Sequence, residues 1–475
     1  MGIQENHRDK RGESMSDRCR YIAITDINRG PEIDDIQSMI RLLLYSNEID
    51  IEGLIACSSC FLKKPNMAQN TAILHRLIDG YGVVRSNLLC HADGWPDTAY
   101  LHSIVSDGIP VFGQGEGDGF AEPRWKDNAG VQAILSSLQR GDPRPLWIGL
   151  WGGANTLAQA LWTAEQTMKA ETFTDCLQKL RIYSISDQDH AGPWIRARYG
   201  DRLFYIVSPS RCDCDGAADY YRATWPGISA DRFAHGSEDG VNRTNGFTGA
   251  RRDLVSNRWL RRNIRIGSFG RMYPRTKYIM EGDTPSFLGL IPNGLNLSEQ
   301  PELGCWGGRY ERRQPQGEPF PIYTNARDTV TGMGGKPHCS PQATIWRWRE
   351  DFQNDFAARM QWTLTSDYTA ANHPPIIEAE QDTFIVHPGD TVRLHVTAHD
   401  PSGVPCTLTW FVYPEAGRDF SYRVPLAVID RGTVALTVPP SVEAESELQI
   451  ILRAANAGSP FHVRYCRISV RVISG

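Results

Sequence analysis

The sequence predicts an α/β domain with a mainly parallel open sheet and flanking helices, followed by an all-β immunoglobulin-like sandwich. Two observations support this prediction. Up to about residue 295, short apolar runs alternate with helical patterns, which is typical of βαβ units. After residue 371, only short alternating runs remain, and turn sequences such as Pro388-Gly-Asp390 and Asp400-Pro-Ser-Gly403 separate them, as in an antiparallel sandwich.

The strands expected in the parallel sheet are short apolar runs. They cover residues 21–27, 51–57, 146–150, 180–185 and 203–207. Helical patterns lie beside them at residues 36–46, 66–81, 130–139 and 156–170. Residues 296–345 have little periodicity, and a helix is expected at 343–363. Because βαβ crossovers are right-handed, the carboxyl ends of these strands should meet at one edge of the sheet.

The sandwich is expected after Asn372-His-Pro-Pro375, which has the composition of a linker. Its strands should cover residues 383–386, 391–398, 408–412, 433–438, 448–454 and 462–473. The chain therefore divides into a polar tail at 1–19, expected to be disordered, an α/β domain at 20–371 and a sandwich at 372–475.

Composition excludes several classes of function. The 475 residues carry a net charge of −5 and no basic run interleaved with aromatics, so nucleic acid is not an expected partner. No run approaches the roughly 20 apolar residues that span a membrane. Residues 1–20 contain no apolar core of a signal peptide, so we expect a cytoplasmic protein as the sequence is written, or a secreted one if a leader was removed. The 11 scattered cysteines do not suggest a disulfide framework.

The end of the first expected strand is rich in oxygen ligands. Asp26 and Asn28 follow the apolar run, and Asp34 and Asp35 come after a Gly/Pro turn at the start of a helix. Adjacent carboxylates at a helix N-terminus gain from the helix dipole, but their mutual repulsion calls for a cation or for hydrogen-bond donors. Hard oxygen ligands suit Ca²⁺ or Mg²⁺ better than zinc. The alternative interpretation is an N-cap followed by a solvated turn.

Other strand ends add polar groups in the same way. The Gly-rich turn Trp151-Gly-Gly-Ala-Asn155 leads into a helix, and its glycines would let the backbone approach a ligand, although a tight structural turn is the alternative. Asp187-Gln-Asp189-His190 ends another strand, with His190 expected at the surface, and Glu281-Gly-Asp283 precedes an apolar helix. In an open parallel sheet these groups should converge on one crevice.

Several of these segments carry a resemblance to a known family. They are Thr25-Asp-Ile with Asp34-Asp35, Leu43-Leu-Tyr-Ser-Asn-Glu48, Trp151-Gly-Gly-Ala-Asn-Thr-Leu-Ala-Gln-Ala-Leu161, Tyr183-Ser-Ile-Ser-Asp-Gln-Asp189, Met280-Glu-Gly-Asp-Thr-Pro-Ser-Phe-Leu288 and Tyr413-Pro-Glu-Ala-Gly417. With them, residues 20–475 resemble the calcium-dependent nucleoside hydrolase superfamily. The chain is most similar to a family described as cellulose-binding, with a nucleoside-hydrolase-like N-terminal domain and a β-sandwich C-terminal domain.

The resemblance implies a role for each candidate residue. It implies a Ca²⁺ ion as cofactor, held by the carboxylates of Asp26, of the pair Asp34-Asp35 and of Asp283, and by a backbone carbonyl at Trp151 or Gly152. The candidate substrate-binding residues are Asn155, Asp187, Glu281 and Trp151. The candidate catalytic residues are Asp34, Asn28, Asn155, Asp187 and Asp189.

Three positions depart from the pattern of the nucleoside hydrolases. Asn28 stands where the family has an aspartate that acts as the base, so Asp34, Glu32 or Asp26 would have to accept the proton of the attacking water. Gly282 stands where the family has a histidine that protonates the leaving group. Ser58 and Ser59 replace an expected asparagine.

The first functional hypothesis is therefore a hydrolase of glycosyl bonds, ancestrally N-glycosyl bonds, that uses a Ca²⁺-assisted water in the α/β crevice. The rival hypothesis is a non-catalytic carbohydrate-binding protein that retains a polyol and cation site, and the third is a purely structural role. The expected partner is a small glycoside or sugar, with a polysaccharide and a second copy of the chain left open.

Overall fold

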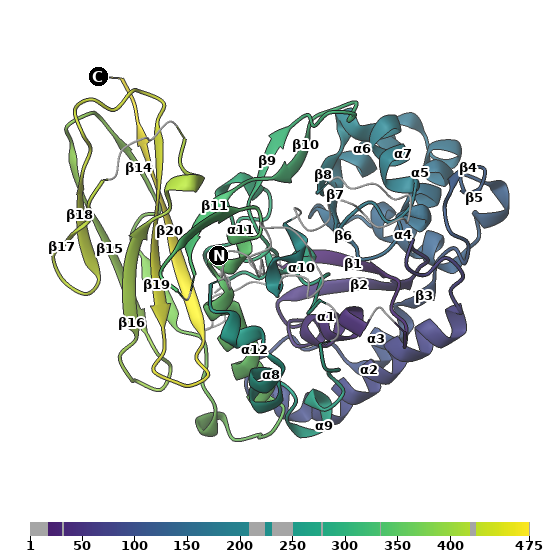
Figure 1. Cartoon of the computed structure of the whole chain (residues 1–475), viewed down its shortest axis with the longest axis horizontal. Coiled ribbons are helices and arrows are strands. Elements are labelled where there is room, and N and C mark those ends of the chain that lie inside the picture. The colour runs from purple at the N-terminus through teal and green to yellow at the C-terminus, as the bar shows by residue number, and fades with distance from the viewer. Residues whose placement is uncertain are drawn as a thin grey trace, which may run out of the picture.

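In the computed structural model an α/β domain stands beside a β-sandwich, as the sequence predicts (Figure 1). The structure describes residues 18–30, 33–208, 224–229, 250–276, 279–332, 334–418 and 424–474. The prediction of an α/β fold with a mainly parallel sheet and a C-terminal all-β sandwich is confirmed. Within the described residues, no helix is both long enough and apolar enough to cross a membrane.

In the described part of the α/β domain, the sheet has eight strands in the order β3-β2-β1-β6-β7-β8-β10-β9. The strand pairs from β3 to β10 are parallel, and only β9 and β10 pair in antiparallel fashion. In chain order the strands are β1 (Cys19–Thr25), β2 (Ile49–Ala56), β3 (Val105–Asp107), β6 (Leu146–Leu150), β7 (Leu180–Ser184), β8 (Phe204–Val207), β9 (Tyr310–Arg313) and β10 (Ile322–Asn325). From β1 the chain adds β2 and then β3 on one side. It then crosses to the other side of β1, where it adds β6, so the strand order reverses at β1.

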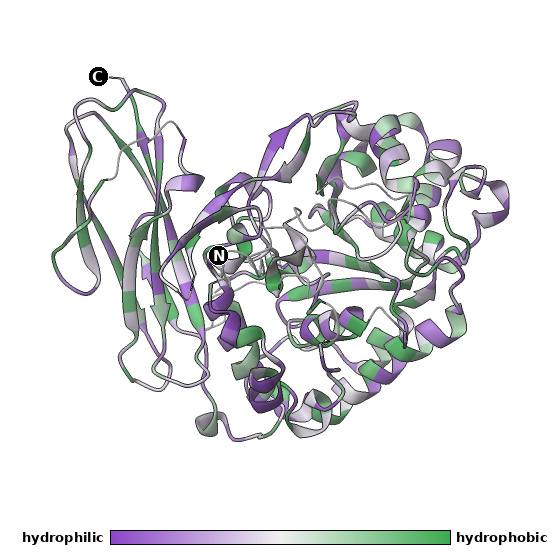
Figure 2. Cartoon of the chain, in the orientation of Figure 1, coloured by the Kyte–Doolittle hydropathy of each residue, from purple (hydrophilic) through white to green (hydrophobic). Residues whose placement is uncertain are grey.

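Both faces of the sheet are covered, which is why its strands are almost continuously apolar. Tyr21 and Ala23 of β1 pack into one hydrophobic cluster, and Ile22 and Ile24 pack into the other. The first cluster takes residues from α1 (Ile33–Leu43), α2 (Met67–Leu88), α10 (Pro285–Leu288) and α12 (Arg349–Trp362), and the second from α4 (Ala129–Gln139), α5 (Asn155–Thr167), α6 (Ala170–Lys179) and α7 (Ala191–Tyr199). Figure 2 shows the hydrophobic colour concentrated in the central strands.

Shorter elements complete the α/β domain. They are the helices α3 (Thr98–Ser103), α8 (Asn257–Asn263), α9 (Gly267–Gly270) and α11 (Ala343–Trp346), and the strand pairs β4 (Gly115–Glu116) with β5 (Gly119–Phe120) and β11 (Asp328–Thr331) with β12 (Pro337–Ser340).

Over its described residues, the sandwich consists of two four-stranded sheets. One has the order β13 (Ile376–Ala379), β15 (Thr391–His399), β18 (Thr433–Thr437), β17 (Ala427–Val428), and the other β14 (Thr383–Val386), β20 (Val463–Val472), β19 (Glu447–Ala455), β16 (Thr407–Val412). The strand pairs are antiparallel except for β14 with β20. Leu394 and Val434 from one sheet and Ile450 and Ile468 from the other belong to the same buried core, as the alternating pattern requires.

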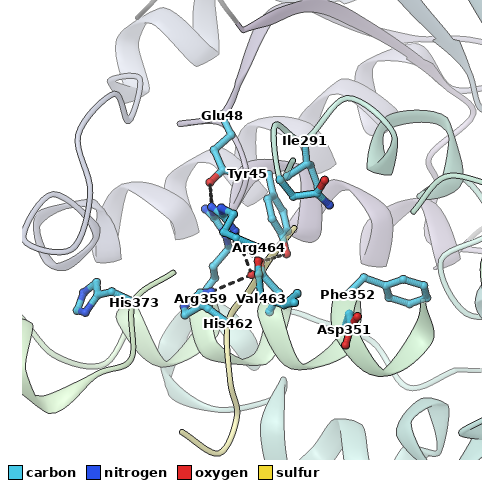
Figure 3. A network of polar contacts seen from close by, with 12 residues as sticks. Tyr45, Glu48, Ile291, Asp351, Phe352, Arg359, His373, His462, Val463 and Arg464 are labelled. Atoms are coloured by element: carbon cyan, nitrogen blue, oxygen red, sulfur yellow. Dashed lines mark hydrogen bonds and ion pairs between the residues drawn. The ribbon is translucent and has the colours of Figure 1, made fainter. Parts of the chain in front are cut away.

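A polar network joins the two domains at α12 (Figure 3). Glu48, which follows α1, accepts hydrogen bonds from Arg359 of α12 and from Arg464 of β20, the latter at 3.0 Å. Asp355 of α12 bonds His462 Nδ1 at 2.9 Å. These side chains are almost entirely withdrawn from solvent. The sandwich is therefore fixed to the α/β domain by buried charged groups as well as by apolar contacts.

The structure differs from the sequence prediction at several element ends. The first strand ends at Thr25 rather than at residue 27, and the first helix begins at Ile33, which puts Asp34 and Asp35 inside its first turn. The helix expected at 66–81 continues to Leu88 despite Gly80 and Gly82, because its later turns bury apolar side chains. The helix expected at 343–363 is divided into α11 and α12. Residues 296–345, where no strand is expected, supply β9 to β12.

Candidate functional site

The predicted site residues lie at the carboxyl ends of the central strands, around the point where the strand order reverses. Asp26 follows β1, Trp151 follows β6 and Asp187 follows β7. Ser58 and Ser59 follow β2. Ligands of open α/β sheets bind in the crevice outside such a point of reversal.

Three of the predicted acids form one group. Ligand oxygens of Asp34, Asp35 and Asp283 lie within 4.8 Å of one another. Asp34 and Asp35 come from the first turn of α1, and Asp283 from the loop just before α10. The residues are 8%, 1% and 3% exposed, respectively. Within the described part of the chain, this is the one group of three or more acids, histidines or cysteines spaced for a metal ion.

The chemistry of this group fits a hard divalent cation. Its donors are carboxylate oxygens, without histidine or cysteine, and Ca²⁺ binds oxygen ligands at about 2.3–2.6 Å. The upper separation of 4.8 Å is about twice that bond length. Three carboxylates this close repel one another, and the N-terminus of the eleven-residue helix α1 offsets only part of that repulsion. A bound cation would neutralise the rest.

Asp26, the fourth predicted metal ligand, lies beside this group but is not part of it. It is 1% exposed, accepts a hydrogen bond from Ser59 Oγ and contacts the carboxyl group of Asp35. Burial raises the pKa of Asp26 to about 6, although the hydrogen bond from Ser59 favours the ionised form. Thr25 Oγ1 donates in turn to Asp35. Sequence reasoning missed Thr25 and Ser59 as donors, although their hydroxyl groups beside strand-end acids were the available signal.

Among the described residues, Gln188 is the one donor to the backbone carbonyl of Trp151, the group predicted as a cation ligand. Gln188 Nε2 donates to this oxygen at 2.6 Å, which leaves the second lone pair. The glycines that follow have a packing role. A Cβ atom at Gly152 would lie 2.9 Å from Asp26 Cβ, and one at Gly153 would lie 2.6 Å from Asp189 Oδ2. They therefore let the turn approach the two acids closely.

Asn28, at the position of the family's base, is used within its own turn. Its Nδ2 donates to the carbonyl of Asp26 at 3.0 Å, and its Oδ1 accepts from the Gly30 amide at 2.6 Å. Gly282, the second departure, lies against Asp34. A Cβ atom at 282 would be 2.7 Å from Asp34 Oδ2, so the observed position of this carboxylate excludes a side chain there.

Asn155 and Asp189 connect neighbouring loops and lie outside the group of three acids. Asp189 accepts hydrogen bonds from the backbone amides of Asn155 and Ala191, each at 3.0 Å, at the starts of α5 and α7. Burial raises the pKa of Asp189 to about 7, despite these amides. Asn155 Nδ2 donates to the carbonyl of Val111 at 2.6 Å and to Ser58 Oγ at 3.2 Å.

Asp187 and Glu281, predicted as substrate-binding residues, are held in buried ion pairs and do not belong to the group of three acids. Arg196 donates to both oxygens of Asp187 at 2.8 Å. Arg41 donates to Glu281 at 2.5 and 3.1 Å. His190 is exposed, as expected from the sequence. Glu32, the alternative base, lies outside the described residues.

Two family models match the chain. The model described as "Cellulose-binding Sde182, nucleoside hydrolase-like domain" matches residues 20–310. The model described as "Cellulose-binding protein Sde0182, C-terminal domain" matches residues 391–472. No curated protein sequence gives a significant match.

A solved structure resembles the chain over almost its whole length. It is a nucleoside hydrolase-related hypothetical protein from Saccharophagus degradans that is associated with carbohydrate metabolism, with 30% identity and a TM-score of 0.74 over 96% of this chain and 100% of that chain. Two further solved structures are too distant to support an argument. Titin domain M7 has 13% identity and a TM-score of 0.16 over 21% of this chain and 95% of that chain. The endo-fucoidan hydrolase MfFcnA4 from glycoside hydrolase family 107 has 10% identity and a TM-score of 0.18 over 97% of this chain and 63% of that chain.

Proposed function

Because the chain belongs to the family described as cellulose-binding Sde182 with a nucleoside hydrolase-like domain, we propose that its crevice hydrolyses glycosyl bonds with the help of a bound Ca²⁺ ion. The observation that carries this proposal is the buried group of Asp34, Asp35 and Asp283. Three converging carboxylates at the carboxyl edge of a parallel sheet are costly unless hydrogen-bond donors, a cation or a proton compensate them. A Ca²⁺ ion, the cofactor of the nucleoside hydrolases, would compensate the charge of these carboxylates.

In this proposal Asp35 and Asp283 hold the cation together with one oxygen of Asp34, and Asp26 and the carbonyl of Trp151 are further candidate ligands. A Ca²⁺ ion held there would supply electrostatic stabilisation and a binding point for vicinal sugar hydroxyls. Asp34 is the most exposed of the three acids, at 8% against 1% and 3%, and so offers its second oxygen to a water molecule most readily. We assign Asp34 as the general base.

We expect Ca²⁺ to stabilise the folded protein. After removal of cations with a chelator, adding Ca²⁺ at about 100 times its Kd should add roughly 2.7 kcal/mol to the free energy of unfolding, since the unfolded chain has no such cluster. The melting temperature, measured by calorimetry, should rise with Ca²⁺ concentration. Asp35→Ala should abolish the rise, while Asp175→Ala, at an exposed position of α6, should retain it. If millimolar Ca²⁺ does not change the melting temperature of the wild-type protein, the proposal of a cation site is contradicted.

A second candidate function is carbohydrate binding without turnover. The observation that favours it is the local structure at two positions. Both polar atoms of the Asn28 side chain are engaged in its turn, and Gly282 supplies no acid for the leaving group. A site with these features can retain recognition of a polyol after losing the groups that transfer protons.

One experiment separates the two functions. The wild-type protein, stripped of cations and then reloaded with Ca²⁺, is incubated with nucleosides and with N- and O-glycosides, and released sugar is quantified, while calorimetry measures binding of the free sugars. Release of sugar that depends on Ca²⁺ supports the hydrolase. Binding without release from any of these compounds supports the binding protein, and neither binding nor release contradicts both proposals.

A further inference from the structure

The segment from Arg251 to Arg275 carries a high density of positive charge. Its 25 residues contain eight arginines and a single acidic residue, Asp253, in a chain whose net charge is −5. The segment includes the short helices α8 and α9, and Figure 2 shows α8 mostly in the hydrophilic colour. None of its side chains has a role in the proposed carboxylate site.

Most of these arginines are exposed and lack an acidic partner. Arg251 is paired with Asp253 and Glu350. Exposed arginines elsewhere are also paired, as Arg198 is with Glu165. Six exposed arginines of the segment, in contrast, form no ion pair with any described carboxylate, and they are Arg252, Arg258, Arg261, Arg262, Arg271 and Arg275. Their positive charge is therefore left to solvent.

Three of the six lie together on α8. Arg261 and Arg262 are three and four positions after Arg258, so both are its neighbours on the helix surface, with Cβ atoms about 5–6 Å from its own. Leu260, between them in sequence, is buried and turns the other side of the helix to the core. Like charges at this spacing repel one another and destabilise a helix. A ligand with several negative charges would relieve that repulsion.

Two further arginines adjoin these three. The side chain of Asn257, at the start of α8, accepts a hydrogen bond from the amide of Thr276 at 3.1 Å and donates to its carbonyl at 3.3 Å. This pairing brings Arg275 beside the helix. Arg252 begins the turn that leads into α8. We call the surface formed by Arg252, Arg258, Arg261, Arg262 and Arg275 the basic face.

The segment is attached to the helix that carries two of the clustered acids. The carbonyl of Pro274 accepts a hydrogen bond at 3.1 Å from Nε2 of Gln37, which lies on α1 about one turn after Asp34. The chain then continues from the segment to the loop of Asp283. A polymer held on the basic face would therefore be held beside the elements that form the carboxylate site.

The other side chains of the segment narrow the choice of polyanion. Trp259 is partly buried, and Phe269 and Tyr273 are buried in the core, so the segment offers no row of exposed rings on which bases could stack. No large hydrophobic side chain is exposed between residues 251 and 275, so the segment has no apolar anchor for a lipid surface. Guanidinium groups instead suit the paired oxygens of carboxylate and other oxyanion groups.

We propose that the basic face binds an anionic polysaccharide, whose carboxylate or sulfate groups pair with the exposed arginines. The choice of a polysaccharide rests on the proposed function, because a polymer held here could supply the crevice with glycosyl bonds. The binding itself requires neither Ca²⁺ nor cleavage. Cellulose carries no charge, so this ligand differs from the one by which the matched families are described.

The test measures binding of the full chain to polygalacturonate and to dextran sulfate, in chelator and at low salt. Uncharged dextran and double-stranded DNA are compared under the same conditions. We expect an anionic polysaccharide to bind, uncharged dextran not to bind, and binding to be lost at 1 M salt, where the Debye length is about 3 Å. Tighter binding of polygalacturonate identifies carboxylate groups as the partners, and tighter binding of dextran sulfate identifies sulfate groups.

Variants locate the binding on the basic face. Replacing Arg258, Arg261 and Arg262 together with glutamine should weaken binding by about 10-fold, since three exposed ion pairs are lost. Lysine at the same three positions keeps the charge and should retain most of the affinity. The matched control removes the same charge from exposed positions outside the segment and should leave the affinity almost unchanged; it replaces Arg312, Arg393 and Arg471 with glutamine. The melting temperature of each variant shows that it is folded.

Three results would overturn the proposal. The first is that neither anionic polysaccharide binds the wild-type protein at low salt. The second is an equal loss of affinity in the glutamine variant and in its matched control, since net charge rather than the basic face would then decide binding. The third is tighter binding of DNA than of both polysaccharides. The Ca²⁺-dependent melting temperature and the release of sugar from small glycosides are separate readouts, so the proposed function and this inference can fail independently.

Discussion

Replacing Asp34 with asparagine should lower glycosyl-bond turnover by about 10²–10⁴-fold and leave sugar binding in place. Asparagine has nearly the same shape as aspartate, but it cannot accept a proton from water at neutral pH. The fit is favourable because Gly282 leaves room for this side chain. The measurement is the rate of sugar release at saturating substrate, compared with the affinity for the free sugar by calorimetry.

The control for this variant is Ca²⁺ binding, because Asp34 is also one of the three clustered acids. If Asp34→Asn keeps the Ca²⁺-dependent rise in melting temperature and loses turnover, the carboxylate acts as the base. If both are lost, Asp34 acts mainly as a ligand. A variant that cleaves as fast as the wild type contradicts our assignment, and Asp26 or Glu32 becomes the next candidate base. Asp283→Asn, at a ligand position, should lose the Ca²⁺ response and turnover together.

The α/β architecture could be predicted because its signal is local. Strands buried on both faces are continuous apolar runs, and each helix from α1 to α7 lies between two of them in sequence. The antiparallel edge strands had no such signal. Three of the four residues of β9, from Glu311 to Arg313, are exposed, and β10 pairs with β8 through a single residue pair. Their position depends on tertiary contacts, which an irregular sequence rich in Gly, Pro and Arg does not reveal.

The candidate site was predictable only in part, for a related reason. Position at a strand end identified the acids, and three of them form one group. Position alone could not tell which acids already have a basic partner. Asp187 pairs with Arg196, which is nine positions away on α7. Glu281 pairs with Arg41, which is 240 positions away. The fold must be known before such pairs can be recognised.

One motif behind the family resemblance has a structural explanation. The segment at 43–48 reads as the end of a helix, yet its polar side chains reach α12 and the sandwich. Tyr45 donates to Asp355 at 2.7 Å, and Asn47 accepts from Arg359 at 2.8 Å. Its sequence therefore reflects the attachment of the two domains rather than chemistry in the crevice.

Replacing Arg41 with methionine should lower the free energy of unfolding by about 3–5 kcal/mol, because it leaves the Glu281 carboxylate buried without its cation. Both side chains are completely buried. Arg41 also donates to the carbonyl of Phe352 and to the side chain of Gln353, and its guanidinium lies 3.9 Å from the centroid of the Phe356 ring. One residue of α1 therefore contacts both α12 and the loop that carries Asp283.

This connection gives the variant a second expected effect. Asp34 and Asp35 are on α1, and Glu281, which has a left-handed backbone with φ of 52°, is two residues before Asp283. Loss of the ion pair should let the helix and the loop separate, and so weaken Ca²⁺ binding although no ligand has changed. Chemical denaturation and Ca²⁺ titration measure the two effects. Arg198→Met, which removes a partly exposed ion pair with Glu165, is the matched control and should cost less than about 1 kcal/mol. If Arg41→Met costs as little as this control, the buried pair does not hold the site together, and the three acids must be positioned by the surrounding core alone.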